Sequence, residues 1–258
     1  MARRLGRKKR PSREAHMLKE QLKIDSGIFD DQTMVYLSKF FNKGVMSRLG
    51  FIIARGKEAE VYVAEARDAE VAKGAKYVIM KFYRVETSSF LNMTDYIIGD
   101  PRFSKVSKSK HAIINTWCKK EYGNLEIARL AGANAPKPYM FNGTILAMEF
   151  IGSDEGVPAP HLKDAVLEDP EHVMNSIIGQ IRRLYLRELV HADLSEYNVL
   201  MKGSTPYMID FGQAVVLRHP NAMRFLRRDV ENIVRYFSKH YGIERSAEDV
   251  LKYVTGPA

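Results

Sequence analysis

The chain has 258 residues, of which 45% are hydrophobic and 28% charged, and its net charge is +9. These are ordinary globular values at a length that can bury a large core, so disorder over most of the chain is excluded. The single cysteine, Cys118, excludes an internal disulfide. No apolar run reaches the length of a membrane span, and the basic N-terminus lacks the apolar core of a secretory signal. We therefore expect a cytoplasmic protein that does not contact a membrane.

The positive charge is concentrated at the N-terminus. Seven basic residues precede the first acidic one, and without them the remainder of the chain would carry only +2: Arg3, Arg4, Arg7, Lys8, Lys9, Arg10 and Arg13. We expect residues 1–13 to be disordered. Such a tail attracts polyphosphates such as RNA, but it is equally consistent with a solvated segment that binds nothing, or with an import signal in a nucleated cell.

Helical periodicity follows the tail and then gives way to strands. Apolar residues recur at helical spacing between residues 14 and 46, which predicts N-terminal helices, the second of them capped by Asp30 or Asp31. Three β-rich runs separated by glycine-containing turns come next, at 47–54, 60–66 and 76–82.

Residues 84–111 have few periodic apolar residues, and a connection this long is either disordered or functional. Ser104, Ser107 and Ser109 lie there among lysines. We predict autophosphorylation on one of these three hydroxyls.

The second half of the chain is mostly helical. A helix is predicted over 113–130, ending near Gly132, and two strands over 139–151 around the turn signal Asn142-Gly143. Further helices are predicted at 161–167, 170–189 and 221–241.

Two short motifs carry the chemistry. The first, His191-Ala192-Asp193-Leu194 followed by Asn198, matches the pattern H-x-D-L-x-x-x-N of phosphoryl-transfer enzymes, and the second is Asp210-Phe211-Gly212. In that pattern Asp193 orients the attacking hydroxyl, while Asn198 and Asp210 take metal ions. Both motifs in this order, with a short hydrophobic run leading into the second, predict a site for a divalent metal and a triphosphate.

Such a site also needs cations on the phosphates. Lys81, at the end of the third β-rich run, has the position of a lysine that contacts the α- and β-phosphates. It needs an acidic partner, for which Glu121 on the following helix is the best candidate and Glu126 the second.

Backbone contacts to the nucleotide are less clearly marked. The turn Gly56-Lys57-Glu58 stands where a glycine-rich loop would cover the phosphates, but it has one glycine, so side chains would share that work. The run that ends at Ile151 fits an inter-lobe hinge, with Glu149 and Ile151 reading adenine, or alternatively a plain core strand.

Two further residues support the loop around Asp193. Asp229 resembles the buried aspartate that braces the catalytic loop from a helix, and His191 is expected to pack and hydrogen-bond behind the site and not to accept the substrate proton.

Gly56-Lys57-Glu58-Ala59, the motif from His191 to Asn198 and the motif from Ile209 to Ala214 together resemble the RIO family of atypical serine/threonine protein kinases, and the Gly-Lys-Glu-Ala form resembles its first subfamily. The resemblance covers residues 47–240. It implies a reduced bilobal kinase-like fold of the α+β class. The N-lobe would span 47–148 and the C-lobe 152–258, with the helices of 14–46 packed on the kinase domain 47–258.

The same resemblance implies no activation segment, in agreement with Asp229 following Phe211 by only 18 positions. It also implies an ATP- and Mg²⁺-dependent kinase or ATPase, with Mn²⁺ as an alternative metal. The expected enzyme autophosphorylates and acts as a monomer on the small ribosomal subunit precursor, in contact with rRNA and protein.

Two alternatives remain. A kinase-fold small-molecule phosphotransferase shares both motifs, although the short segment 153–170 lacks the acidic insertion usual in those enzymes. An RNA-binding scaffold on an inactive kinase fold is disfavoured because every expected catalytic residue is present.

Overall fold

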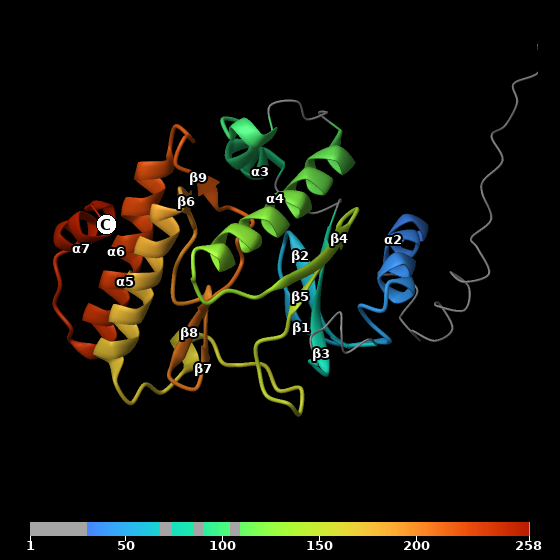
Figure 1. The fold of residues 1–258 in the computed structure, drawn as a ribbon, viewed down its shortest axis with the longest axis horizontal. Helices are drawn as coiled ribbons and strands as arrows, with labels where there is room; N and C mark the ends of the chain where they lie inside the picture. The colour runs from blue at the N-terminus through green and yellow to red at the C-terminus, as the bar shows by residue number, and fades with distance from the viewer. Residues whose placement is uncertain (1–29, 68–73, 85–89, 104–108, 258) are drawn as a thin grey trace, which may run out of the picture.

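A five-stranded antiparallel sheet forms the N-terminal half of the molecule, with strand order β1-β2-β3-β5-β4 (Figure 1). The computed structural model describes residues 30–67, 74–84, 90–103 and 109–257, so the predicted tail 1–13, the first predicted helix, Ser104 and Ser107 lie outside the described residues. The strands of the sheet are β1 (Arg48–Arg55), β2 (Ala59–Glu65), β3 (Tyr77–Tyr83), β4 (Pro138–Asn142) and β5 (Ile145–Glu149). The predicted strands, and both hairpin turns, are confirmed to within a few residues.

Two helices cover opposite faces of this sheet. Side chains alternate along a strand, so Val78, Met80 and Phe82 of β3 pack in one cluster with α2 (Asp31–Asn42), while Ile79 lies in the other cluster with α4 (Lys110–Leu130). This alternation places Lys81 on the α4 side of the sheet. Asp30 is the N-cap of α2, as predicted, and its Oδ1 accepts from Thr33 N at 2.7 Å.

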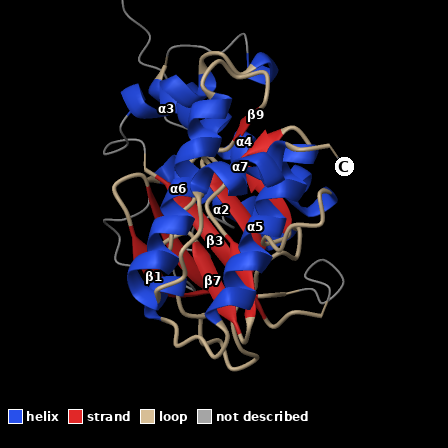
Figure 2. Ribbon diagram, turned by 90° about the vertical axis from the view of Figure 1, so that its left-hand side faces the viewer, coloured by secondary structure: helices blue, strands red, loops and turns tan. Residues whose placement is uncertain are grey.

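The C-terminal half is mainly helical, and Figure 2 shows α5 and α6 in front of the strands. Its elements are α5 (Pro170–Leu186), α6 (Ala222–Tyr241), α7 (Ala247–Thr255) and two small strand pairs, β6 (Leu189–Val190) with β9 (Val215–Val216) and β7 (Val199–Lys202) with β8 (Thr205–Met208). The β-rich half and the helical half confirm the predicted α+β class.

The polar connection 84–111 contains structure that its composition did not indicate. A short helix, α3 (Phe90–Ile97), and a 3-10 turn, η1 (Pro101–Phe103), precede α4. Met93 and Ile97 are both buried, and this single pair at helical spacing is too short a signal among so many polar residues.

Two helix predictions between residues 161 and 189 need correction, and one further helix was not expected. The predicted helix 161–167 is wrong, because only a 3-10 turn, η2 (Leu162–Asp164), forms there, with Leu162 buried and Val166 97% exposed. Helix α5 ends at Leu186 instead of residue 189, because Leu189 and Val190 pair with β9. Helix α7 was not predicted. Within the described part of the chain, none of the helices is both long and apolar enough for a bilayer crossing.

Candidate active site

Lys81 is the centre of the candidate active site. Its Nζ donates to Glu121 Oε1 on α4 and to Asp210 Oδ1 after β8, each at 2.9 Å. The Lys81 and Glu121 side chains are 8% and 1% exposed. Burial alone would lower the pKa of Lys81, but the charges of Asp210 and Glu121 outweigh it and raise that pKa, so the ammonium stays charged.

Lys81 also acts on its two acidic partners. Burial raises the pKa of Glu121 to about 7, against the attraction of Lys81. Burial alone would raise the pKa of Asp210, but Lys81 and the hydrogen bond from the Gly212 backbone N–H outweigh it and lower that pKa. Asp210 has a φ of 62°, a left-handed conformation that a non-glycine residue adopts only where its surroundings hold it. Glu126, the second candidate partner, is exposed on α4.

The loop between β6 and β7 carries the first motif. Asn198 Nδ2 donates to the backbone oxygen of Asp193 at 2.8 Å and to Asp193 Oδ2 at 3.2 Å. Burial, followed by the charge of Asp210, raises the pKa of Asp193 to about 6, with Arg228 acting in the opposite direction. The structure thus places an acceptor of raised basicity beside Asn198.

Asp229 holds this loop from α6, as expected. Its carboxylate accepts from Ala192 N at 2.7 Å and from Leu194 N at 2.9 Å. These two bonds fix Ala192 at a φ of 65°. Asn232 Nδ2 donates to the Leu194 carbonyl at 3.0 Å, so one helix fixes the loop at several backbone groups.

His191 lies behind the site. Its Nε2 is 3.0 Å from the Ile209 carbonyl oxygen, and its ring centroid is 4.6 Å from that of Phe211. Burial lowers the pKa of His191 to about 4, so the ring is neutral and donates Nε2–H to Ile209. This is the packing position expected of it.

A cavity of about 480 Å³ opens between the sheet and the C-terminal half. Its wall contains many of the residues predicted from sequence, namely Lys81, Glu121, Glu149, Ile151, Asn198 and Asp210. Gly56 and Lys57 are exposed at the β1–β2 turn and are not in the wall that the described residues form. Glu58 is half-buried. Burial raises its pKa, and the charge of Asp210 raises it further, so Glu58 interacts electrostatically with the site.

Some backbone groups of the two predicted hinge residues already make hydrogen bonds within the chain. Glu149 N donates to the Lys137 carbonyl at 2.8 Å, and the Ile151 carbonyl accepts from Ala159 N at 3.0 Å. Adenine recognition would therefore fall to the other backbone groups of Glu149 and Ile151, and it stays a prediction.

Comparisons with known proteins agree with this geometry. A family model described as the RIO domain matches residues 60–250. The protein named RIO-type serine/threonine-protein kinase Rio1 in Haloferax volcanii is 37% identical over 238 residues, covering 92% of this chain and 79% of that protein. Its namesake in Methanocaldococcus jannaschii is 40% identical, with the same coverage of 92% and 79%. The chain belongs to the RIO family.

Relatives of this RIO chain extend to eukaryotes. Human serine/threonine-protein kinase RIO1 is 32% identical over 255 residues, covering 95% of this chain and 44% of the human protein. These names confirm the predicted first subfamily. The crystal structure of a Rio2 kinase–ADP/Mg²⁺–phosphoaspartate complex from Chaetomium thermophilum is 21% identical and covers 87% of this chain and 67% of its own, with a TM-score of 0.65. It confirms the kinase-like fold.

The donor set of the RIO site fits Mg²⁺ with a nucleotide. Mg²⁺ usually takes one or two protein oxygens and completes its shell with phosphates and water. Asn198 and Asp210 both line the cavity and offer an amide oxygen and a carboxylate. Across the described ranges no group of three or more His, Cys, Asp or Glu side chains could hold a metal ion by itself.

Two polar residues near the site of this RIO chain are not among those that the sequence predicts. Lys120 and Asn124 are buried on α4, on either side of Glu121, and both face the segment after Asp210. The one sequence signal was their spacing: Trp117, Lys120, Glu121 and Asn124 follow the helical period, so a buried face through Glu121 includes all four.

Proposed function

We propose that this RIO family kinase transfers the terminal phosphoryl group of Mg²⁺-bound ATP to a serine hydroxyl and also phosphorylates itself. The observation that carries the proposal is the contact of Lys81 Nζ with both Glu121 and Asp210 at 2.9 Å, at the wall of a nucleotide-sized cavity. It joins the phosphate lysine to the metal aspartate across the two halves of the molecule.

Each residue then has one task. Lys81, held extended by Glu121, binds the α- and β-phosphates, and Asn198 and Asp210 hold Mg²⁺, for which Mn²⁺ would be a substitute. The bound metal supplies charge neutralisation on the phosphates. Asp193 orients the acceptor hydroxyl and takes its proton, a task that its raised pKa supports.

The experiment follows label from γ-labelled ATP and Mg²⁺ incubated with the purified protein, with Asp210→Ala as the blank. Retained label that resists hydroxylamine indicates a serine ester and supports the proposal. Label removed by hydroxylamine would indicate a carboxyl phosphate, the kind of group present in the Rio2 kinase phosphoaspartate complex from Chaetomium thermophilum. Normal turnover in Asp210→Ala would overturn the assignment.

For autophosphorylation we propose Ser104, Ser107 or Ser109 as the acceptor. Ser109 is exposed at the N-cap of α4, where its Oγ accepts from Ala112 N at 3.3 Å, so phosphate there would meet the positive end of the helix dipole. Phosphopeptide mapping tests this assignment, and label found solely on other residues would contradict it.

As partner we propose the small ribosomal subunit precursor, with the chain acting as a monomer. The seven basic residues of 1–13 support contact with RNA. Binding to purified subunits should weaken steeply with salt, and deletion of 1–13 should flatten that dependence. An unchanged salt dependence would remove the tail from the interface. Phosphate released faster with subunits, with little label retained, would make the protein an ATPase in practice.

A further inference from the structure

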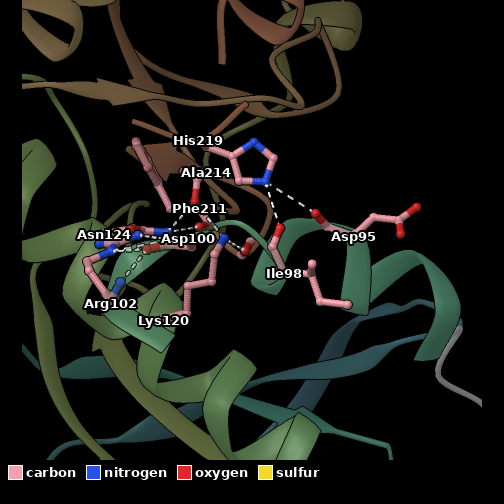
Figure 3. Close-up of polar contacts among 10 residues, drawn as sticks. Asp95, Ile98, Asp100, Arg102, Lys120, Asn124, Phe211, Ala214 and His219 are labelled. Atoms are coloured by element: carbon pink, nitrogen blue, oxygen red, sulfur yellow. Dashed lines mark hydrogen bonds and ion pairs between the residues drawn. The ribbon is translucent and has the colours of Figure 1, made fainter. Parts of the chain in front are cut away.

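Helix α4 holds the segment Phe211–Ala214 through two buried side chains (Figure 3). Lys120 Nζ donates to the carbonyl oxygens of Gly212 at 2.8 Å and Ala214 at 2.5 Å. Asn124 Nδ2 donates to those of Phe211 and Ala214, both at 2.9 Å. These four hydrogen bonds, here termed the Lys120–Asn124 clamp, fasten three backbone carbonyls of a loop to one helix.

The clamp contains a buried amine, which is costly to keep charged. Lys120 is 1% exposed, and Asn124 is fully buried. Burial lowers the pKa of Lys120 to about 7, against the attraction of Asp100. Asp100 is itself 2% exposed and is bound by Arg102, with Nη2 2.7 Å from Oδ2. A buried amine needs compensation of this kind, whereas an apolar side chain would fill the same space without a desolvation cost.

The clamped segment directly follows Asp210 in the chain. Asp210 has its φ of 62° held in the left-handed region, and the Gly212 N–H helps to keep its carboxylate ionised. Packing around Gly212 is tight as well, because a Cβ there would lie 2.8 Å from Trp117 Nε1. A shift of Gly212 would therefore move the carboxylate that meets Lys81.

We propose that Lys120 and Asn124 are positioning residues that fix the Asp210 carboxylate by holding Phe211–Ala214 against α4. Helix α4 then places both partners of Lys81: Glu121 directly, and Asp210 through the clamp. The inference rests on the proposed role of Asp210 as a ligand of Mg²⁺ in phosphoryl transfer.

The test compares Lys120→Met with Lys119→Met in the full chain. Both variants replace a lysine by methionine at adjacent positions of the same helix, but Lys119 is exposed. For Lys120→Met we expect kcat to fall by about tenfold or more and the Mg²⁺ concentration for half-maximal activity to rise several-fold, with a smaller change in KM for ATP. Lys119→Met should behave as the unsubstituted protein, and Lys120→Arg should recover part of the loss.

A second measurement does not depend on turnover. Hydrogen exchange of the nucleotide-free protein should speed up in the peptide spanning Phe211–Ala214 in Lys120→Met, and not in Lys119→Met. If Lys120→Met does not fold, Asn124→Leu, which keeps the lysine, is measured in the same way.

The outcomes separate the two proposals. Unchanged kcat and Mg²⁺ requirement in folded Lys120→Met and Asn124→Leu would overturn the clamp, even if both variants melt at lower temperature. Equal activity of the unsubstituted protein and Asp210→Ala would overturn the proposed function instead.

Discussion

Lys81 and Asp210 are in direct contact, with Nζ 2.9 Å from Oδ1, although they lie 129 positions apart in the chain. The contact joins the sheet to the C-terminal half at the edge of the cavity. It brings two of the proposed phosphate- and metal-binding groups together from the two halves of the molecule.

Replacing Asp210 by asparagine keeps the shape of the side chain but removes its charge. We expect turnover to fall by about a thousandfold or more, because the metal would lose a charged ligand. Label from γ-labelled ATP gives the rate. Asp154→Asn, which changes an exposed carboxylate, is the control and should be neutral. Turnover in Asp210→Asn within a few fold of the control would contradict the metal assignment.

Glu121→Gln should lower turnover by about ten- to a hundredfold, because Lys81 would be held by Asp210 alone. Glu126→Gln on the exposed side of the same helix is the matched control. Glu121→Gln should also melt at a lower temperature than Glu126→Gln, because the buried Lys81 ammonium loses one of its two charged partners. A larger loss in Glu126→Gln would reverse the choice of partner.

The pH dependence of kcat/KM should report Asp193. Its pKa is raised to about 6, so the ionised fraction, and with it the rate, should fall as pH decreases through that value. The terminal phosphate of ATP also titrates near there. Arg228 lowers the pKa of Asp193, so Arg228→Met should move the acid limb to higher pH. If the acid limb stays at the same pH in Arg228→Met, it reports titration of the nucleotide and not of Asp193.

Stability should fall in acid because of His191. Its pKa is lowered from an ordinary 6.5 to about 4 in the folded protein. Below pH 6.5 the imidazole is therefore protonated in the unfolded chain but stays neutral in the folded one. The loss grows as pH falls from 6.5 to 4 and reaches about 3 kcal/mol. Urea unfolding at pH 7 and pH 4.5 should show a smaller drop for His191→Phe. Equal drops would mean that other groups control the acid limb.

Much of the site could be predicted from sequence because its chemistry depends on residue types at fixed spacing. Asp193, Asn198 and Asp210 are such residues, and the strand period alone places Lys81 on the cavity side. The choice of Glu121 over Glu126 follows from the helix period, since the buried Trp117 and Leu125 share a face with Glu121.

The contacts of Lys120 and Asn124 could not be predicted, because their partners are backbone carbonyls, and the helical spacing indicates only that both residues share the face of Glu121. A lysine in a helix is normally solvated, and only the packed structure shows that this one is enclosed. Helix α3 could not be predicted for a related reason, since burial of Met93 and Ile97 depends on tertiary contacts and not on a long local pattern.

Helix α2 determines where an expression fragment of this protein can begin. The matched RIO domain begins at residue 60, inside β2, whereas the face of the sheet opposite α4 is closed by Met34, Leu37 and Phe40 of α2. Asn142 Nδ2 also donates to the Tyr36 carbonyl at 2.9 Å, which ties α2 to the β4–β5 turn. A fragment trimmed to the matched domain would lose β1 and uncover this apolar surface. The matched domain is therefore smaller than the unit of folding, and an expression fragment must include α2 with its N-cap Asp30.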